Sequence, residues 1–341
     1  MTPTVSAIVA VYNRFRLVKR SVESILGQTR PVDEIIVVDD GSTDETPTHL
    51  PTHIKETPSW RGRVRYVRQE NQGQSAAFNN GIAEARGEWL AFNADDDVWL
   101  PQKLEWQFRA LERFGSECAL CFSDAFFVNS PLMKMTLFQH ARRRHDEEVG
   151  IVRDPVGYVL GRGAYPGVSA VCVQTTLART DLVRAVGGFD AKLHLWEDYD
   201  FLLRLARLTT FCFVSTPAVL IDRSPDQQRH VGASKAWHDG AFVLSMQQYR
   251  YEKMLRLDQG TPTVVTQAAR KGLRSVHSMW ATMHLANGDY AKAREAIRRA
   301  LSYQLTPATA VKCALAHVVP GLLRQGLAMR RSVTGRLDFP A

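Results

Sequence analysis

Three adjacent carboxylates, Asp95, Asp96 and Asp97, interrupt an apolar run in the stretch WLAFNADDDVWLP, which spans Trp89–Pro101. Neighbouring like charges repel one another, and the free-energy cost grows where an apolar core excludes water. A cation would offset that cost. Mg²⁺ in proteins typically takes one or two carboxylates, while substrate phosphates supply further ligands. The pattern therefore favours a divalent cation beside a phosphate-bearing ligand. Capping of the helix expected to begin at Pro101 is the alternative, but it needs only one Asp.

Aromatic and acidic residues also follow two earlier strand patterns. The run Val5–Asn13 ends in Tyr12, and the run Asp33–Asp40 ends in Asp39 and Asp40. Ligands of open parallel sheets bind beyond the carboxyl ends of the strands. We therefore expect these side chains to share one rim with the three aspartates. Turn formation in DDGSTD is the alternative for Asp39 and Asp40.

Alternating elements are expected to position that rim. Apolar strand patterns alternate with helical ones, which predicts an α/β fold with a doubly wound, mostly parallel sheet. A more polar strand is expected at Arg63–Gln69, and a later strand at Cys118–Val128. The charged residues 130–153, which include ARRRHDEE, are expected to form an irregular surface loop. Neither GxGxxG nor GxxxxGK[ST] occurs, so the two usual glycine-rich phosphate loops are excluded.

The chain is expected to contain two parts, residues 1–235 and a helical extension, 236–341. The net charge is +8, and the extension holds 15 Lys and Arg against 6 Asp and Glu, whereas the first part holds 28 against 29. Within the extension, HVVPGLLRQGLAMRRSVTGR (His317–Arg336) mixes apolar residues with four arginines and no acid. Such segments bind anionic membrane surfaces, although solvated helix faces have the same composition. No aromatic-interleaved basic motif points to nucleic acid.

Cysteine usage and hydropathy favour a cytoplasmic protein. The five cysteines lie mostly in apolar surroundings and suit buried, reduced thiols. No apolar run approaches the roughly 18 residues of a membrane span, and the N-terminus reads as a strand and not as a signal peptide. A peripheral position on the inner face of the cell membrane is expected if the basic segment binds lipid.

Five segments resemble, in order and spacing, the family-2 glycosyltransferases with the GT-A fold. They are SAIVAVYNR, IIVVDDGSTDET, ENQGQSAAFNNGIAEARGEWLAFNADDDVWLP, GGFD and WEDYDFLLRL, within Val5–Ser234. Each motif alone is short, whereas five in sequence are specific. The resemblance implies a GT-A-type domain at 1–235 that uses a nucleoside-diphosphate sugar, with a UDP-sugar favoured. It also implies Mn²⁺ or Mg²⁺ as cofactor and inverting transfer to an acceptor hydroxyl. The acceptor would be a glycan or a lipid-linked molecule in cell-surface polysaccharide biosynthesis.

The resemblance also implies roles for individual residues. Asp198 would be the general base, with Glu197 in support. The donor would contact Tyr12, Asp39, Asp40, Asn71, Gly73, Ser75, Asp95 and Asp96. The metal would bind Asp95, Asp96, Asp97 and His230. Plain alternatives exist, because helix starts favour acids, a loop and helix cap explains ENQGQSAA, and a lone His is usually structural.

The sequence departs from the family pattern at several points. Many relatives carry Asp where this chain has Asn93, and Thr where it has Val11, which weakens the expected ribose and base contacts. The QxxRW signature of processive members is absent, so single transfers are expected. Two alternatives remain open: sugar transfer to a polyprenyl phosphate, which needs no strong base, and a non-catalytic nucleotide-sugar-binding protein.

Overall fold

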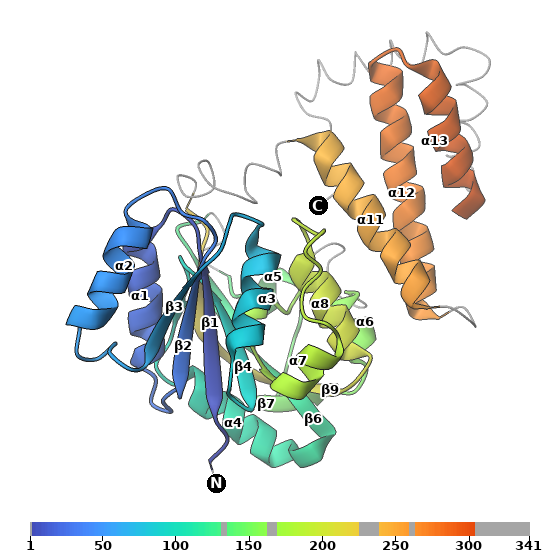
Figure 1. Ribbon diagram of the computed structural model, residues 1–341. Coiled ribbons are helices and arrows are strands. Elements are labelled where there is room, and N and C mark those ends of the chain that lie inside the picture. Colours follow the sequence, from blue (N-terminus) through green and yellow to red (C-terminus); the bar gives the residue numbers. More distant parts are fainter. Residues whose placement is uncertain (1, 131–134, 162–168, 225–238, 259–262, 304–341) are drawn as a thin grey trace. The chain divides into compact units, whose positions relative to one another are not determined.

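A computed structural model describes residues 2–130, 135–161, 169–224, 239–258 and 263–303 (Figure 1). The chain divides into two compact units, residues 1–235 and 236–341.

One sheet organises the first unit. Its order in the described residues is β3-β2-β1-β4-β8-β6-β9-β5, and β7 pairs with β9 away from this path. The strands are β1 (Val5–Val11), β2 (Glu34–Asp39), β3 (Val64–Arg68), β4 (Trp89–Ala94), β5 (Val98–Trp99), β6 (Cys118–Val128), β7 (Val149–Val152), β8 (Thr176–Arg179) and β9 (Thr210–Asp222).

Helices lie on both sides of this sheet (Figure 1). They are α1 (Phe15–Leu26), α2 (Thr46–Glu56), α3 (Gln74–Glu84), α4 (Lys103–Phe114), α5 (Leu137–His140), α6 (Pro155–Val159), α7 (Thr180–Ala185) and α8 (Glu197–Ala206). The same unit contains two short 3-10 helices, η1 (Gly115–Glu117) before β6 and η2 (Val173–Thr175) before β8.

The central strand β1 is buried along its whole length, as expected for a parallel strand covered on both faces. Val9 shares one hydrophobic cluster with Val18 and Val22 of α1. The preceding residue of the strand, Ile8, faces Gly81 of α3 so closely that a Cβ on Gly81 would lie 2.3 Å from Ile8 Cγ2. Because successive strand residues point to opposite faces, α1 and α3 cover opposite sides of the sheet.

The predicted α/β class is confirmed, and its parallel part is the region β3-β2-β1-β4. The other half is mixed, because β8 runs antiparallel to both β4 and β6, while β6 and β9 are parallel. The expectation of an irregular loop at 130–153 is wrong in part. Within it, α5 forms behind a capping box at Thr136, and β7 pairs antiparallel with β9. Four-residue elements are too short for a periodic sequence signal, and β7 depends on the long edge that β9 offers.

The second unit contains α11 (Gly240–Leu257), α12 (Val264–Ala286) and α13 (Tyr290–Tyr303) in its described residues. The helices α12 and α13 flank the stretch ANGDY, and Gly288 adopts φ 78° at the turn between them. Ala281 of α12 packs with Ala296 and Ile297 of α13. The basic segment 317–336 lies outside the described residues. No helix among those described is long and apolar enough to cross a membrane.

Candidate active site

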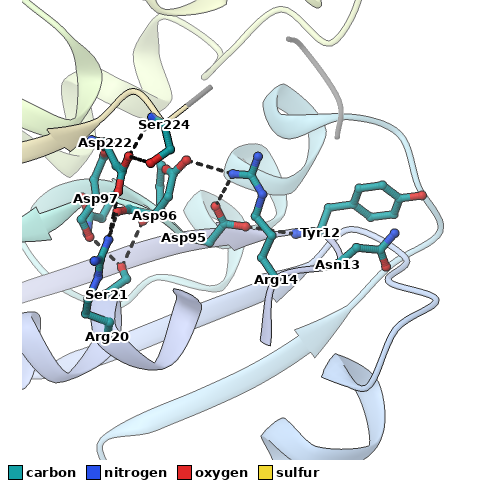
Figure 2. A network of polar contacts seen from close by, with 12 residues as sticks. Tyr12, Asn13, Arg14, Arg20, Ser21, Asp95, Asp96, Asp97, Asp222 and Ser224 are labelled. Atoms are coloured by element: carbon teal, nitrogen blue, oxygen red, sulfur yellow. Dashed lines mark hydrogen bonds and ion pairs between the residues drawn. The ribbon is translucent and has the colours of Figure 1, made fainter. Parts of the chain in front are cut away.

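Strand register brings the predicted rim together. In the parallel pairing, Val11 of β1 lies opposite Asp39 of β2, and Ala10 lies opposite Ala94 of β4. The residues that follow these strands are therefore neighbours. The amide of Asp40 donates to Val11 O at 2.9 Å. The amide of Tyr12 lies 3.5 Å from Asp95 Oδ2, and its ring points away from the aspartates (Figure 2).

Arg14 is the central cation of this network, and the sequence interpretation missed it. Its Nη1 donates to Asp95 Oδ1 at 3.0 Å and to Asp96 Oδ2 at 2.9 Å, so one nitrogen bridges two carboxylates (Figure 2). All three side chains are largely buried, with 16% of Arg14, 9% of Asp95 and 17% of Asp96 exposed. The sequence did contain a signal for this contact. A basic residue, Arg14, follows a strand whose neighbour in the sheet ends in carboxylates.

The electrostatics of this triplet follow from its burial. Burial raises the pKa of Asp95 to about 7, the charge of Asp96 adds to the rise, and Arg14 opposes it. Burial lowers the pKa of Arg14, but Asp95 and Asp96 outweigh that effect and raise it on balance. Two carboxylates facing one guanidinium thus still carry uncompensated negative charge when both are ionised.

Asp97 lies on the other side of the cluster, beside Asp222 (Figure 2). It is 1% exposed, and its Oδ1 accepts from the Asp222 amide at 2.9 Å. Its Oδ2 has no hydrogen-bond partner among the described residues. Burial raises the pKa of Asp97 to about 8, and the charge of Asp96 contributes to the rise. A role for Asp97 in metal binding stays a prediction, and in this structure it links the β4 end to the β9 end.

Arg20 and Asp222 complete that side of the network. Arg20 Nη2 donates to the Asp96 carbonyl at 2.8 Å and lies 3.4 Å from Asp222 Oδ2. Asp222 also accepts from Asn129 Nδ2 at 2.9 Å and from the Ser224 hydroxyl at 2.7 Å. Asp222 lies 125 residues from Asp97 in the chain, so no local motif could have indicated this pairing.

Asn93, where many relatives carry Asp, lies beneath the rim. Its side chain is fully buried, and Nδ2 donates to Ser21 Oγ at 2.9 Å and to the Asp97 carbonyl at 3.0 Å. Ser21 Oγ in turn donates to the Ala94 carbonyl at 3.0 Å. An amide can donate where an ionised carboxylate cannot. The Asn at this position therefore tethers the turn that carries Asp95 and Asp96 to α1.

Asp40 holds the loop before α3. Its Oδ1 accepts from Gln69 Nε2 at 2.8 Å and from the Gln72 amide at 2.9 Å, and its Oδ2 accepts from the Gly73 amide at 2.8 Å. Gly73 has φ 89°, and a Cβ there would lie 3.3 Å from His194 Nδ1. Asp40, a candidate donor contact, thus shapes the loop before α3, and the Gly73 side of this loop meets His194 just before α8.

The remaining donor candidates have mainly structural contacts. Asp39 is fully buried and accepts from the Ser42 amide at 2.8 Å and from the Tyr66 hydroxyl at 2.6 Å. Ser75 donates to the Leu193 carbonyl at 3.1 Å. Asn71 packs so close to Gly41 that a Cβ on Gly41 would lie 2.7 Å from the Asn71 amide nitrogen. Their contacts with a nucleotide stay predictions.

Glu197 and Asp198 form the first turn of α8, after Trp196 in a left-handed conformation with φ 60°. Such a backbone conformation is uncommon outside glycine and concentrates at functional sites. Burial raises the pKa of Glu197 to about 8, and the charge of Asp198 adds to the rise. Burial therefore favours the protonated form of Glu197.

Cys172 connects the two acidic groups. Burial raises the pKa of its thiol to about 12, and the charges of Asp198 and Asp97 add to the rise, while Arg223 opposes it. The charges of the WEDYD and NADDD motifs thus both influence one buried thiol. His230, the predicted histidine ligand, lies outside the described residues.

The arrangement of the carboxylates indicates what kind of metal site this region could form. No group of three or more His, Cys, Asp or Glu side chains is arranged to hold a metal within the part of the chain that the structure describes. Asp95 and Asp96, however, turn one oxygen each toward a common cation, the Arg14 nitrogen. The residues therefore fit a divalent ion that takes one or two carboxylates and completes its shell from a phosphate ligand.

Comparison with known sequences finds similarity to glycosyltransferases. The model of a family described as Glycosyl transferase family 2 matches residues 6–165. An uncharacterized glycosyltransferase of Rickettsia prowazekii (strain Madrid E) is 28% identical over 212 residues, which are 62% of this chain and 61% of that protein. An uncharacterized glycosyltransferase of Rickettsia bellii (strain RML369-C) is 36% identical over 270 residues, 78% of this chain and 37% of that protein. The match to the first of these relatives thus spans about three fifths of its length.

Solved structures show the same fold. S. aureus TarS 1-349 in complex with UDP-GlcNAc superposes with a TM-score of 0.65 at 15% identity, covering 98% of this chain and 92% of that chain. The mannosyltransferase PcManGT from Pyrobaculum calidifontis, in complex with GDP-Man and Mn²⁺, has a TM-score of 0.53 at 18% identity, covering 98% and 88%.

Proposed function

Because the chain belongs to glycosyl transferase family 2 and has its GT-A fold, we propose that it transfers a sugar from a nucleoside-diphosphate sugar to an acceptor hydroxyl with inversion of the anomeric carbon. The observation that carries this proposal is the pair of carboxylates after β4: Asp95 Oδ1 and Asp96 Oδ2 converge on one cation, Arg14 Nη1, at 3.0 and 2.9 Å. A divalent ion held by these oxygens would bind the diphosphate of the donor.

The donor is proposed to be a UDP-sugar. One structural neighbour binds UDP-GlcNAc, whereas another binds GDP-Man, so the fold accommodates either base. Asp40 and Tyr12 border the loop before α3 and the end of β1, where the nucleobase of the donor would lie. The three hydrogen bonds that Asp40 accepts from Gln69, Gln72 and Gly73 would fix its carboxylate before the nucleotide arrives. Asp39, Asn71 and Ser75 would support the same loops.

Asp198 would carry the proton transfer. Its carboxylate takes the proton of the acceptor hydroxyl as that oxygen forms a bond to the anomeric carbon. The bond between this carbon and the diphosphate oxygen breaks, and the nucleoside diphosphate leaves with the electron pair. Burial favours the protonated form of Glu197, and this residue is proposed to support Asp198 by donating a hydrogen bond.

A divalent cation, Mn²⁺ or Mg²⁺, would be held by Asp95 and Asp96. When bound, such an ion stabilises the charge of the departing diphosphate. Asp97 and His230 are further candidates for its ligands. The chain's own contribution is to keep Asp95 and Asp96 side by side, which the Asn93 and Ser21 hydrogen bonds beneath the turn accomplish.

A cell-surface glycan or a lipid-linked intermediate is the proposed acceptor. The support is compositional: the 236–341 unit carries the basic excess, and such surfaces are attracted to anionic lipids. A cytoplasmic protein that attaches to the inner membrane face would match that arrangement.

A donor screen tests the proposal. UDP-sugars and GDP-sugars are added with and without Mn²⁺, and the melting temperature is measured, because a ligand that binds only the folded state raises apparent stability. Stabilising donors are then assayed for nucleoside-diphosphate release with glycan acceptors. If neither the UDP-sugars nor the GDP-sugars raise the melting temperature, the proposal is contradicted.

A further inference from the structure

The backbone of Arg14 is held in place by the turn that precedes it. Arg14 precedes α1, directly after Asn13, whose left-handed backbone has φ 56°. Asn13 Oδ1 accepts from the amides of Thr43 and Asp44 at 2.6 and 3.1 Å, and its own amide donates to Ser42 Oγ at 2.9 Å. These bonds anchor the turn on which Arg14 stands. Any rearrangement at this point therefore falls to the long Arg14 side chain.

The oxygens that Arg14 occupies are those a cation would need. Asp95 Oδ1 and Asp96 Oδ2 converge on Arg14 Nη1 at 3.0 and 2.9 Å. A divalent ion binds carboxylate oxygens directly, and it repels a guanidinium at the same oxygens. The two cations therefore compete for these two oxygens.

We infer that Arg14 is an internal competitor of the divalent cation. Its guanidinium neutralises Asp95 and Asp96 in the donor-free protein, and it is released to the donor's diphosphate when cation and donor bind. The inference rests on the proposed function, because it supplies the diphosphate as the second anion. Arginine suits both positions, since its planar donors match carboxylate and phosphate oxygens alike. The exchange keeps charges balanced: the cation replaces Arg14 on the carboxylates, and Arg14 pairs with the phosphate.

Mn²⁺ binding without nucleotide is the first test. Free Mn²⁺ is measured by electron paramagnetic resonance in titrations of the wild-type chain, Arg14→Gln and Arg16→Gln. Arg16 is an exposed residue of the same helix and controls for the loss of one positive charge. Arg14→Gln should bind Mn²⁺ about tenfold more tightly than the wild type, because a charge-assisted competitor is gone. Arg16→Gln should match the wild type. Equal or weaker Mn²⁺ affinity in Arg14→Gln, or no Mn²⁺ binding by any of the three, overturns the inference.

UDP binding at saturating Mn²⁺ tests the second half of the exchange. Here Arg14→Gln should bind UDP about tenfold more weakly than the wild type, because the guanidinium no longer reaches the diphosphate. Arg14→Lys should recover part of this loss, since it restores the charge without the planar fork. Unchanged UDP affinity in Arg14→Gln overturns the transfer to the diphosphate.

The wild-type chain provides a test that does not depend on the variants folding. The side-chain ¹⁵N signals of Arg14 are followed by NMR while Mg²⁺, then UDP, is added. They should shift when the carboxylate pair is broken, and constant signals at saturation overturn the inference. If Mn²⁺ competition is observed but no sugar is transferred from any donor, the proposed function fails and the competition stands.

Discussion

The amide of Gly73 donates to Asp40 Oδ2 over 2.8 Å, which joins the end of β2 to the first residue before α3. The same carboxylate accepts from Gln69 and Gln72, so one side chain organises the whole loop. A carboxylate with several fixed donors is preorganised, and a ligand that meets this loop need not order it.

Replacing Asp40 should therefore loosen the loop and weaken nucleotide binding together. In Asp40→Ala, the amides of Gln72 and Gly73 lose their acceptor, and hydrogen exchange at both should accelerate. UDP affinity should fall by about 10- to 100-fold, the equivalent of one or two hydrogen bonds to a charged group. Hydrogen-exchange mass spectrometry and calorimetry provide the two readouts.

Asp44→Ala is the matched control, because Asp44 is exposed and belongs to the neighbouring turn. It should leave exchange at Gln72 and Gly73 unchanged. If Asp40→Ala keeps wild-type protection at these amides, Asp40 does not hold the loop.

Substitutions at Asp198 and Glu197 should have unequal effects on transfer. Asp198→Asn removes the proposed base and should lower kcat by about 10²- to 10⁴-fold with little change in donor affinity. Glu197→Gln keeps a hydrogen-bond donor at a position where burial favours the protonated acid, so its kcat should stay within about tenfold of the wild type. Initial rates of nucleoside-diphosphate release at saturating donor measure both.

The same pair separates a hydroxyl acceptor from a phosphate one. Transfer to a polyprenyl phosphate needs no strong base, so Asp198→Asn would retain most of its rate with that acceptor. A larger loss in Glu197→Gln than in Asp198→Asn would reverse the assignment of the base.

Asn93→Asp should destabilise this chain. A carboxylate cannot donate to the Asp97 carbonyl and would repel it, so we expect a loss of about 1–3 kcal/mol in the free energy of unfolding. Urea denaturation at pH 8 measures this.

Acidic conditions provide the internal control for Asn93→Asp. A protonated Asp can donate as the amide does, so the difference from the wild type should shrink as the pH falls toward 5. A variant as stable as the wild type at pH 8 would show that the Asn93 donors are not needed.

The buried side chain of Lys103 should make the stability of the fold depend on pH. It is fully buried, and its Nζ donates to Gln107 Oε1 at 3.0 Å and to the Thr176 carbonyl at 3.3 Å. Burial lowers the pKa of Lys103 to about 7, against 10.5 for an ordinary lysine. Between these values the unfolded chain binds a proton that the folded chain does not. The stability that the neutral, buried Lys103 provides is therefore fully present above pH 10.5 and is lost as the pH falls to 7.

Lys103→Met should remove that dependence. Its free energy of unfolding, measured relative to the wild type in urea, should rise by a few kcal/mol, about 1.4 per unit of pKa difference, as the pH falls from 10 to 7. Lys55→Met, at an exposed position, should show no such trend. A constant difference between Lys103→Met and the wild type across this range would mean that Lys103 is charged in the folded chain.

Much of the fold follows from local patterns. The alternation of apolar runs and amphipathic helices predicted β1 to β4 within a residue or two, because burial on both faces leaves a continuous apolar run. The same patterns placed Tyr12, Asp40 and Asp95 at strand ends. Parallel pairing then made them neighbours, so the rim of the site was determined by the sequence.

Tertiary structure decided what those side chains contact. Asp97 bonds the backbone of Asp222, Asn93 points beneath the rim, and Arg14 bridges Asp95 and Asp96. Each contact joins residues from different elements, and its partner is set by strand register, side-chain rotamer and burial. Periodicity records only which face of an element is covered. The sequence therefore determined that negative charge gathers at this rim, and the tertiary structure decided that an arginine of the same chain is its first counter-ion.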